Sequence, residues 1–131
     1  MIGVDTNVVV RYLTQDDPKQ ARLAAALLET ECSAEQPGFL NDIVLCELVW
    51  VLEDAYGYTR AQIAPVLELL IRTSQLRAAD AASAWRAVEA YRKGFDFADA
   101  LLGDVNLSAG CDETVTFDQR AAKLPGFRLL K

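Results

Sequence analysis

Apolar and polar residues follow two different periodicities along the 131-residue chain, and their succession predicts short strands separated by helices. Short, mainly apolar runs typical of buried strands occur at 2–5, 39–40, 76–79, 114–117 and 127–130. Apolar residues at helical spacing lie between these runs and predict helices from Val8, at 18–33, 43–55, 60–72, 82–92 and 96–110, and a short one ending at Leu124. Parallel strands need crossover connections, so the pattern predicts an α/β fold with a mainly parallel sheet.

Polar residues at the predicted helix starts support these boundaries. Asp5-Thr6-Asn7 offers capping side chains after the first strand, and Asp16-Asp17-Pro18 places an acid before a proline of the first helical turn. Thr59 and Asp80 precede two later helices in the same way. The chain shows no repeat or linker, so we expect a single domain over residues 1–131.

The amino-acid composition excludes several catalytic mechanisms and metal sites. The chain has no histidine, which excludes Ser-His-Asp triads, imidazole acid-base catalysis and histidine-ligated zinc. Three cysteines without C-x-x-C spacing are expected to be reduced core residues, namely Cys32, Cys46 and Cys111. The acidic N-terminus and the lack of a long apolar run predict a cytoplasmic protein without a membrane span. A net charge of -6 argues against unspecific coating of nucleic acids.

Four acids lie inside or directly against apolar runs: Asp5, Glu47, Asp99 and Asp118. Glu47 is the most informative, because the residues three and four positions away on its predicted helix are all apolar and provide no cation. Each acid also has a structural interpretation. The three aspartates could cap helices, and Glu47 could pair with a distant arginine.

The four acids taken together favour a metal site. Clustered carboxylates repel one another by about 4 kcal/mol per pair at 4 Å and an effective dielectric of 20, so they need cations. An all-oxygen site selects Mg²⁺ or Mn²⁺ rather than zinc or copper. Two such ions can activate water and stabilise the leaving oxygen of a phosphodiester, which is nuclease chemistry.

At these residues the sequence resembles a PIN-domain ribonuclease of the VapC toxin type, from bacterial type II toxin-antitoxin pairs. The resemblance covers essentially the whole chain. It is carried by four pieces in the family's order: Val4-Asp5-Thr6-Asn7, Cys46-Glu47-Leu48, Asp96-Phe97-Ala98-Asp99 and Thr116-Phe117-Asp118.

The resemblance implies a ligand set and an architecture. Asp5, Glu47, Asp99 and Asp118 would coordinate Mg²⁺ or Mn²⁺ and carry catalysis. Asp96 would be an auxiliary acid, and Thr6, Asn7 and Thr116 would orient the ligands. It also implies a five-stranded, mainly parallel sheet in the order 3-2-1-4-5 with about seven helices.

The resemblance further implies partners. The substrate would be RNA, with transfer and ribosomal RNA as candidate targets, and Arg11 and Arg120 are the cations best placed for its phosphates. A cognate antitoxin would block the active site, and the toxin would form a homodimer. Trp50, Tyr56, Tyr58 and Trp85 are residue types found at interfaces, although we expect most of them in the core.

Two alternatives and one departure stay open. A catalytically silent PIN domain could act only as a binding or regulatory module. A haloacid-dehalogenase-like phosphotransferase would need a second aspartate at the place of Asn7 and leaves Glu47 unexplained. Gly103-Asp104 departs from the small apolar residues that relatives carry after the third acid, which questions the stability of that helix.

Overall fold

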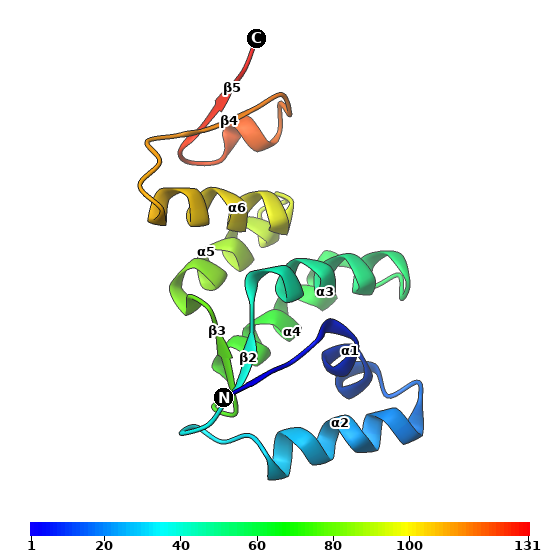
Figure 1. Ribbon diagram of the computed structural model, residues 1–131. Coiled ribbons are helices and arrows are strands. Elements are labelled where there is room, and N and C mark those ends of the chain that lie inside the picture. The colour runs from blue at the N-terminus through cyan, green and yellow to red at the C-terminus, as the bar shows by residue number, and fades with distance from the viewer. The chain divides into compact units, whose positions relative to one another are not determined.

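The computed structural model describes all residues 1–131, and the chain divides into two compact units. Residues 1–81 form the N-terminal unit, drawn from blue to green in Figure 1, and residues 82–131 form the C-terminal unit, drawn from yellow-green to red. All strand pairs are parallel. No helix combines the length and the apolar character that a membrane span requires.

The N-terminal unit joins a three-stranded sheet to four helices (Figure 1). Its elements in chain order are β1 (Ile2–Gly3), α1 (Thr6–Thr14), α2 (Pro18–Thr30), β2 (Gly38–Leu40), α3 (Asp42–Asp54), α4 (Arg60–Arg72) and β3 (Leu76–Ala78). The strand β2 lies in the middle, with Gly38 opposite both Ile2 and Leu76. Because β1 is so short, the chain leaves the sheet directly before Asp5.

Local capping explains where these helices begin. The side chains of Asp17, Asn41 and Thr59 each accept a hydrogen bond from a backbone N–H in the first turn of the following helix. Thr59 forms a complete capping box with Gln62. Helix α2 ends at Thr30 rather than near Ser33 as predicted, because Ser33 closes a loop in which its hydroxyl accepts from the N–H of Gln36.

The apolar faces of these helices form the core of the N-terminal unit. The most deeply buried side chains include Leu40, Leu45, Leu48, Leu52, Ile63 and Leu67. Helix α3 contributes three of these leucines, so its position is fixed by the core while Glu47 on the same helix is half-buried. The core therefore holds the glutamate-bearing helix against α1 and α4.

The C-terminal unit joins two helices to a two-stranded sheet. It contains α5 (Ala81–Arg92), α6 (Phe97–Ser108), β4 (Thr114–Thr116), the 3₁₀ helix η1 (Ala121–Lys123) and β5 (Phe127–Leu129). Thr114 pairs with Phe127 at the start of the parallel strands. The buried rings of Tyr91 and Phe97 pack edge to face at 6.3 Å and join α5 to the start of α6.

The structure explains why Gly103 stands in the helix that follows the third acid. It is buried within α6, and a Cβ at this position would collide with the Phe127 ring, whose Cζ would lie 3.0 Å away. The glycine therefore lets β5 pack closely against α6. The next residue, Asp104, forms an ion pair with Arg86 of α5 at 2.7 Å.

The α/β class with parallel strands is confirmed, and six α-helices with one 3₁₀ helix agree with the predicted seven. The neighbours 3-2-1 and 4-5 of the predicted strand order are also confirmed. A pairing of β1 with β4 and a single domain over residues 1–131 stay predictions.

Two expectations about the core were wrong. Cys32 is buried, but Cys46 is half-buried and Cys111 is exposed, since it lies in the turn that follows the end of α6 at Ser108. None of the four aromatic residues considered for the core is fully buried. Trp50 is exposed and Tyr56, Tyr58 and Trp85 are half-buried, because the smaller Leu, Val and Ile side chains already fill the helix faces that point inward.

Candidate active site

Thr6 connects two of the predicted ligands in the N-terminal unit. Asp5 follows β1 and caps α1, accepting a 2.7 Å hydrogen bond from the N–H of Thr6. The Thr6 hydroxyl donates to Oε1 of Glu47, also at 2.7 Å, although the two residues are 41 positions apart. Thr6 itself is only 8% exposed, so the donor of this bond is buried. Thr6 thus contacts both carboxylates: its backbone N–H binds Asp5 after β1, and its hydroxyl binds Glu47 in the middle of α3.

These carboxylates line an open pocket of about 430 Å³. Asp5 is exposed and Glu47 half-buried, so both are more accessible than the apolar sequence around them suggested. Asn7, which was expected to orient the ligands, lines the same pocket. The other lining residues are Thr6, Val10, Arg11, Val51, Ala55 and Tyr56. The hydrogen bond on Glu47 comes from a neutral hydroxyl and not from the distant arginine considered as an alternative.

Arg11 is fixed at the rim of this pocket. Its Nε donates to Gln20 at 2.7 Å, and its Nη1 lies 3.1 Å from the carboxylate of Asp16 and 3.2 Å from the Tyr56 hydroxyl. The Tyr56 hydroxyl donates to Asp16 at 2.7 Å, and this bond is the main cause that lowers the pKa of Asp16. Tyr56 therefore holds Arg11 and Asp16 at the pocket, a role that no sequence motif predicted.

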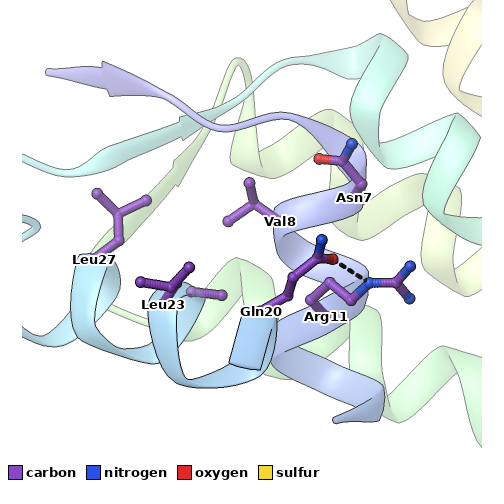
Figure 2. Close-up of a pocket in the computed structure, with 7 residues that line it drawn as sticks. Asn7, Val8, Arg11, Gln20, Leu23 and Leu27 are labelled. Carbon is purple, nitrogen blue, oxygen red and sulfur yellow. Dashed lines mark hydrogen bonds between the residues drawn. The ribbon is translucent and has the colours of Figure 1, made fainter. Parts of the chain in front are cut away.

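A second pocket of about 350 Å³ lies between α1 and α2 (Figure 2). Leu23 and Leu27 of α2 and Val8 of α1 give it apolar walls, and the bond between Arg11 and Gln20 crosses its edge (Figure 2). Leu23 is 64% exposed. Because Asn7 and Arg11 line both pockets, the apolar groove adjoins the carboxylate pocket.

The C-terminal unit gathers the other predicted acids. Asp96 caps α6 and accepts a 2.9 Å hydrogen bond from the N–H of Asp99. Partial burial raises the pKa of Asp99, and the negative charges of Asp96 and Asp118 raise it further. The charged groups that act on Asp99 are thus both negative, so this cluster favours either a proton or a cation.

Asp118 stands at a tightly bonded corner after β4. Its N–H donates to the Thr116 hydroxyl at 3.0 Å, and its Oδ1 accepts from the N–H groups of Arg120 and Ala121. The Arg120 guanidinium lies 4.2 Å from the centre of the Phe95 ring and donates to the carbonyl of Lys93 at 3.2 Å. Thr116 therefore orients the backbone of this corner, and Arg120 is an anchored cation close in sequence to a predicted ligand.

The capping interpretation is confirmed for Asp5, which caps α1, whereas α6 is capped by Asp96 and not by Asp99. Asp118 accepts two backbone N–H bonds, but the 3₁₀ helix η1 begins after Arg120 without a side-chain cap. Asp5, Asp96 and Asp118 each accept these bonds through Oδ1, so the second carboxylate oxygen remains available as a ligand.

The donor set fits a hard divalent cation. Carboxylates are the ligands that Mg²⁺ and Mn²⁺ prefer, and the mutual repulsion at Asp99 is what such an ion would relieve. By itself the structure contains no group of three or more His, Cys, Asp or Glu side chains arranged to hold a metal. The structure thus shows Asp5 and Glu47 at one pocket of the N-terminal unit, while in the C-terminal unit the charges of Asp96 and Asp118 act on Asp99.

The comparisons with known proteins identify the family. The model of the PIN domain matches residues 2–126, a range that includes all four predicted ligands. Neither a search of curated proteins nor a search of solved structures gave a match. PIN domains are typically nucleases that use divalent metal ions. The match spans nearly the whole sequence, and the chain therefore belongs to the PIN domain family.

Proposed function

We propose that this protein is an endoribonuclease that depends on Mg²⁺ or Mn²⁺ and serves as the toxin of a VapBC-type toxin-antitoxin pair. The observation that carries the proposal is the pair of carboxylates, Asp5 and Glu47, held by Thr6 at the wall of an open pocket in a chain of the PIN family. Family membership leaves the phosphotransferase alternative without support.

The proposal assigns metal binding to the four predicted carboxylates. Asp5 and Glu47 would bind at the pocket of the N-terminal unit, and Asp99 and Asp118 would bind in the C-terminal unit. Asp96 would add negative charge beside Asp99, as its effect on the pKa of Asp99 indicates. When bound, the metal supplies an activated water and neutralises charge on the phosphate. Thr6 and Thr116 would fix the orientation of the carboxylates they adjoin.

The expected products follow from the nucleophile. Water attacks the phosphorus, the bond to the 3′ oxygen breaks, and the leaving oxygen takes up a proton. The fragments then carry a 5′-phosphate and a 3′-hydroxyl. Arg11 and Arg120 are anchored cations that could hold neighbouring phosphates, because neither needs to reorganise to accept one.

The apolar groove of Figure 2 supports the proposal of an antitoxin partner. Its leucines are accessible and it adjoins the carboxylate pocket, so a segment seated there could also obstruct substrate. Leu23→Glu should abolish inhibition by the antitoxin encoded beside this gene and leave cleavage intact. The homodimer is part of the same proposal and is tested by the mass of the purified protein in solution.

The decisive assay is cleavage of end-labelled transfer RNA and ribosomal RNA fragments by the antitoxin-free protein with Mg²⁺, Mn²⁺ or EDTA. Wild-type protein should cut at discrete sites only with metal, and Asp5→Asn and Asp99→Asn should both be inactive. The exposed Asp54, at the far end of α3, provides the matched control Asp54→Asn, which should cut normally. Ends carrying 2′,3′-cyclic phosphate would contradict the mechanism. Metal binding without cleavage of any RNA would favour the silent binding module.

A further inference from the structure

Arg11 lies beside two carboxylates of the N-terminal unit and pairs with neither. Arg11, Asp5 and Glu47 line one pocket of that unit. The hydrogen bonds on the two carboxylates come from Thr6, through its backbone N–H and its hydroxyl. A guanidinium ordinarily forms strong and often bidentate pairs with carboxylates. Some other interaction must therefore hold the Arg11 side chain where it is.

Three side chains of the same unit bind the Arg11 guanidinium, and we call Gln20, Asp16 and Tyr56 the arginine clamp. The Nε of Arg11 donates to Gln20 of α2 at 2.7 Å, a bond that Figure 2 shows. Its Nη1 lies 3.1 Å from Asp16, in the loop before α2, and 3.2 Å from the hydroxyl of Tyr56, which follows α3. Two of the three guanidinium nitrogens are thus bound by groups other than the predicted metal ligands.

The Tyr56 hydroxyl closes the clamp, because it acts as acceptor and donor at once. It accepts from Arg11 and donates to Oδ2 of Asp16 at 2.7 Å. Oδ1 of Asp16 accepts from Arg11 and from the Thr14 hydroxyl, so both oxygens of this carboxylate are engaged. The Tyr56 ring packs against the Tyr58 ring at 5.9 Å between centroids. The clamp is therefore a connected network that fixes the direction of the guanidinium.

A mobile Arg11 would compete with a metal ion. No other lysine or arginine lines this pocket, so Arg11 is the cation nearest in the lining to Asp5 and Glu47. A guanidinium released from the clamp could donate to either carboxylate and engage the oxygens that a divalent cation would take. The metal would then have to break an ion pair before binding, and its affinity would fall.

We propose that Tyr56 and Asp16 are positioning residues that keep the Arg11 guanidinium off Asp5 and Glu47, so that these carboxylates stay available to a divalent cation. The inference rests on the proposed function for the assignment of a metal to this pair. It uses contacts within the N-terminal unit alone.

The test compares Mn²⁺ affinities by calorimetric titration, which needs no RNA. Tyr56→Phe deletes both bonds of the hydroxyl and keeps the ring that packs against Tyr58. It is compared with Arg11→Gln and with the double variant Tyr56→Phe/Arg11→Gln. The matched control is Tyr12→Phe, which removes a hydroxyl from a residue of α1 that lines a different pocket. Melting temperatures in EDTA verify that every variant folds.

Tyr56→Phe should bind Mn²⁺ about 2- to 5-fold more weakly than wild type, the factor expected when an ion pair at a protein surface competes with the metal. Arg11→Gln should bind at least as tightly as wild type. The double variant should regain wild-type affinity, because no guanidinium is left to compete, and Tyr12→Phe should match wild type. A merely structural role of Tyr56 would not give this recovery. Wild-type affinity in Tyr56→Phe, or a loss of affinity that persists in the double variant, would overturn the inference.

The clamp and the proposed nuclease fail in different ways. If Asp5→Asn loses Mn²⁺ binding and Tyr56→Phe binds like wild type, the metal site stands and the inference about the clamp is wrong. If the loss in Tyr56→Phe is recovered in the double variant but wild type cuts no RNA, the clamp stands and the nuclease is wrong. If wild type binds no Mn²⁺, both are wrong.

Discussion

Removing the Thr6 hydroxyl should weaken the N-terminal unit and its affinity for metal together. Thr6→Val keeps the shape of the side chain but deletes the 2.7 Å donor to Glu47. A hydrogen bond to a charged group contributes about 1.5–3 kcal/mol to stability. The new methyl group returns up to about 0.8 kcal/mol by burial, since the site is 8% exposed. The net loss should be about 1–2 kcal/mol.

The loss is measurable by thermal unfolding in EDTA. For a domain of this size about 1 kcal/mol corresponds to roughly 4 °C, so the melting temperature should fall by about 4–8 °C. Titration with Mn²⁺ should then show an affinity lower by about 10- to 100-fold, which is typical when a residue that orients a metal ligand is lost. Thr6→Ser should recover most of both effects, because it keeps the donor.

Thr30→Val is the matched control, because the Thr30 hydroxyl donates to a backbone carbonyl on the exposed surface of α2. This change should alter stability by no more than about 0.5 kcal/mol and leave metal affinity unchanged. If Thr6→Val is as stable as Thr30→Val and binds Mn²⁺ like wild type, Thr6 does not organise the carboxylates and the reasoning is refuted.

Three further changes test other parts of the structure. Gly103→Ala should lower the free energy of unfolding in urea, since overpacking against Phe127 costs about 1–3 kcal/mol and the gain in helix propensity is about 1 kcal/mol. Asp42→Asn should raise the melting temperature at pH 7 but not at acid pH, because burial and the charge of Asp80 raise the pKa of Asp42. Arg120→Gln should reduce the slope of log affinity against log salt by about 0.7 in single-stranded RNA binding between 50 and 200 mM KCl.

The sign of the Asp42 effect follows from linkage. A raised native pKa means that the folded chain binds this proton more tightly than the unfolded chain. Protonated Asp42 therefore makes its full contribution to the stability of the folded chain below the ordinary aspartate pKa. This contribution is lost as the pH rises through the raised pKa of the folded state. One Asp42 oxygen is also buried without a hydrogen-bond partner, which fits a carboxylate that is costly when charged. Equal melting temperatures of variant and wild type at pH 7 would contradict this account.

For Gly103→Ala and Arg120→Gln, too, one result would contradict the prediction. Gly103→Ala with unchanged or increased stability would show that the Phe127 ring moves aside at little cost. An unchanged salt slope in Arg120→Gln would show that this guanidinium holds no phosphate.

Helix starts and strand neighbours could be predicted from the sequence because their causes are local. An acid before Pro18, a threonine three residues before Gln62 and an aspartate before Phe97 each satisfy backbone donors within one turn. The strands were recognisable as apolar runs between turn residues. The parallel order within each unit then followed from the helical crossovers and the family.

The environment of the acids could not be predicted, since it depends on long-range contacts. The bond from Thr6 to Glu47 joins residues 41 positions apart. The apolar sequence around Glu47 gave no sign that this side chain is only half-buried. The alternation of Thr114 to Phe117 indicates two faces but not which of them meets water, so exposed Phe117 had the same signature as a core residue. Of the four predicted acids, Asp5 and Glu47 line one pocket of the N-terminal unit, and the charge of Asp118 acts on Asp99 in the C-terminal unit.

The central claim is that the predicted carboxylates bind a divalent metal, and calorimetric titration with Mn²⁺ tests it most directly. Wild type, Asp5→Asn, Asp99→Asn and the control Asp54→Asn would be titrated under the same conditions. The account predicts that each site variant loses Mn²⁺ binding or weakens it at least about tenfold, while the control binds like wild type. Full binding in both site variants, or no Mn²⁺ binding by wild type, would contradict it.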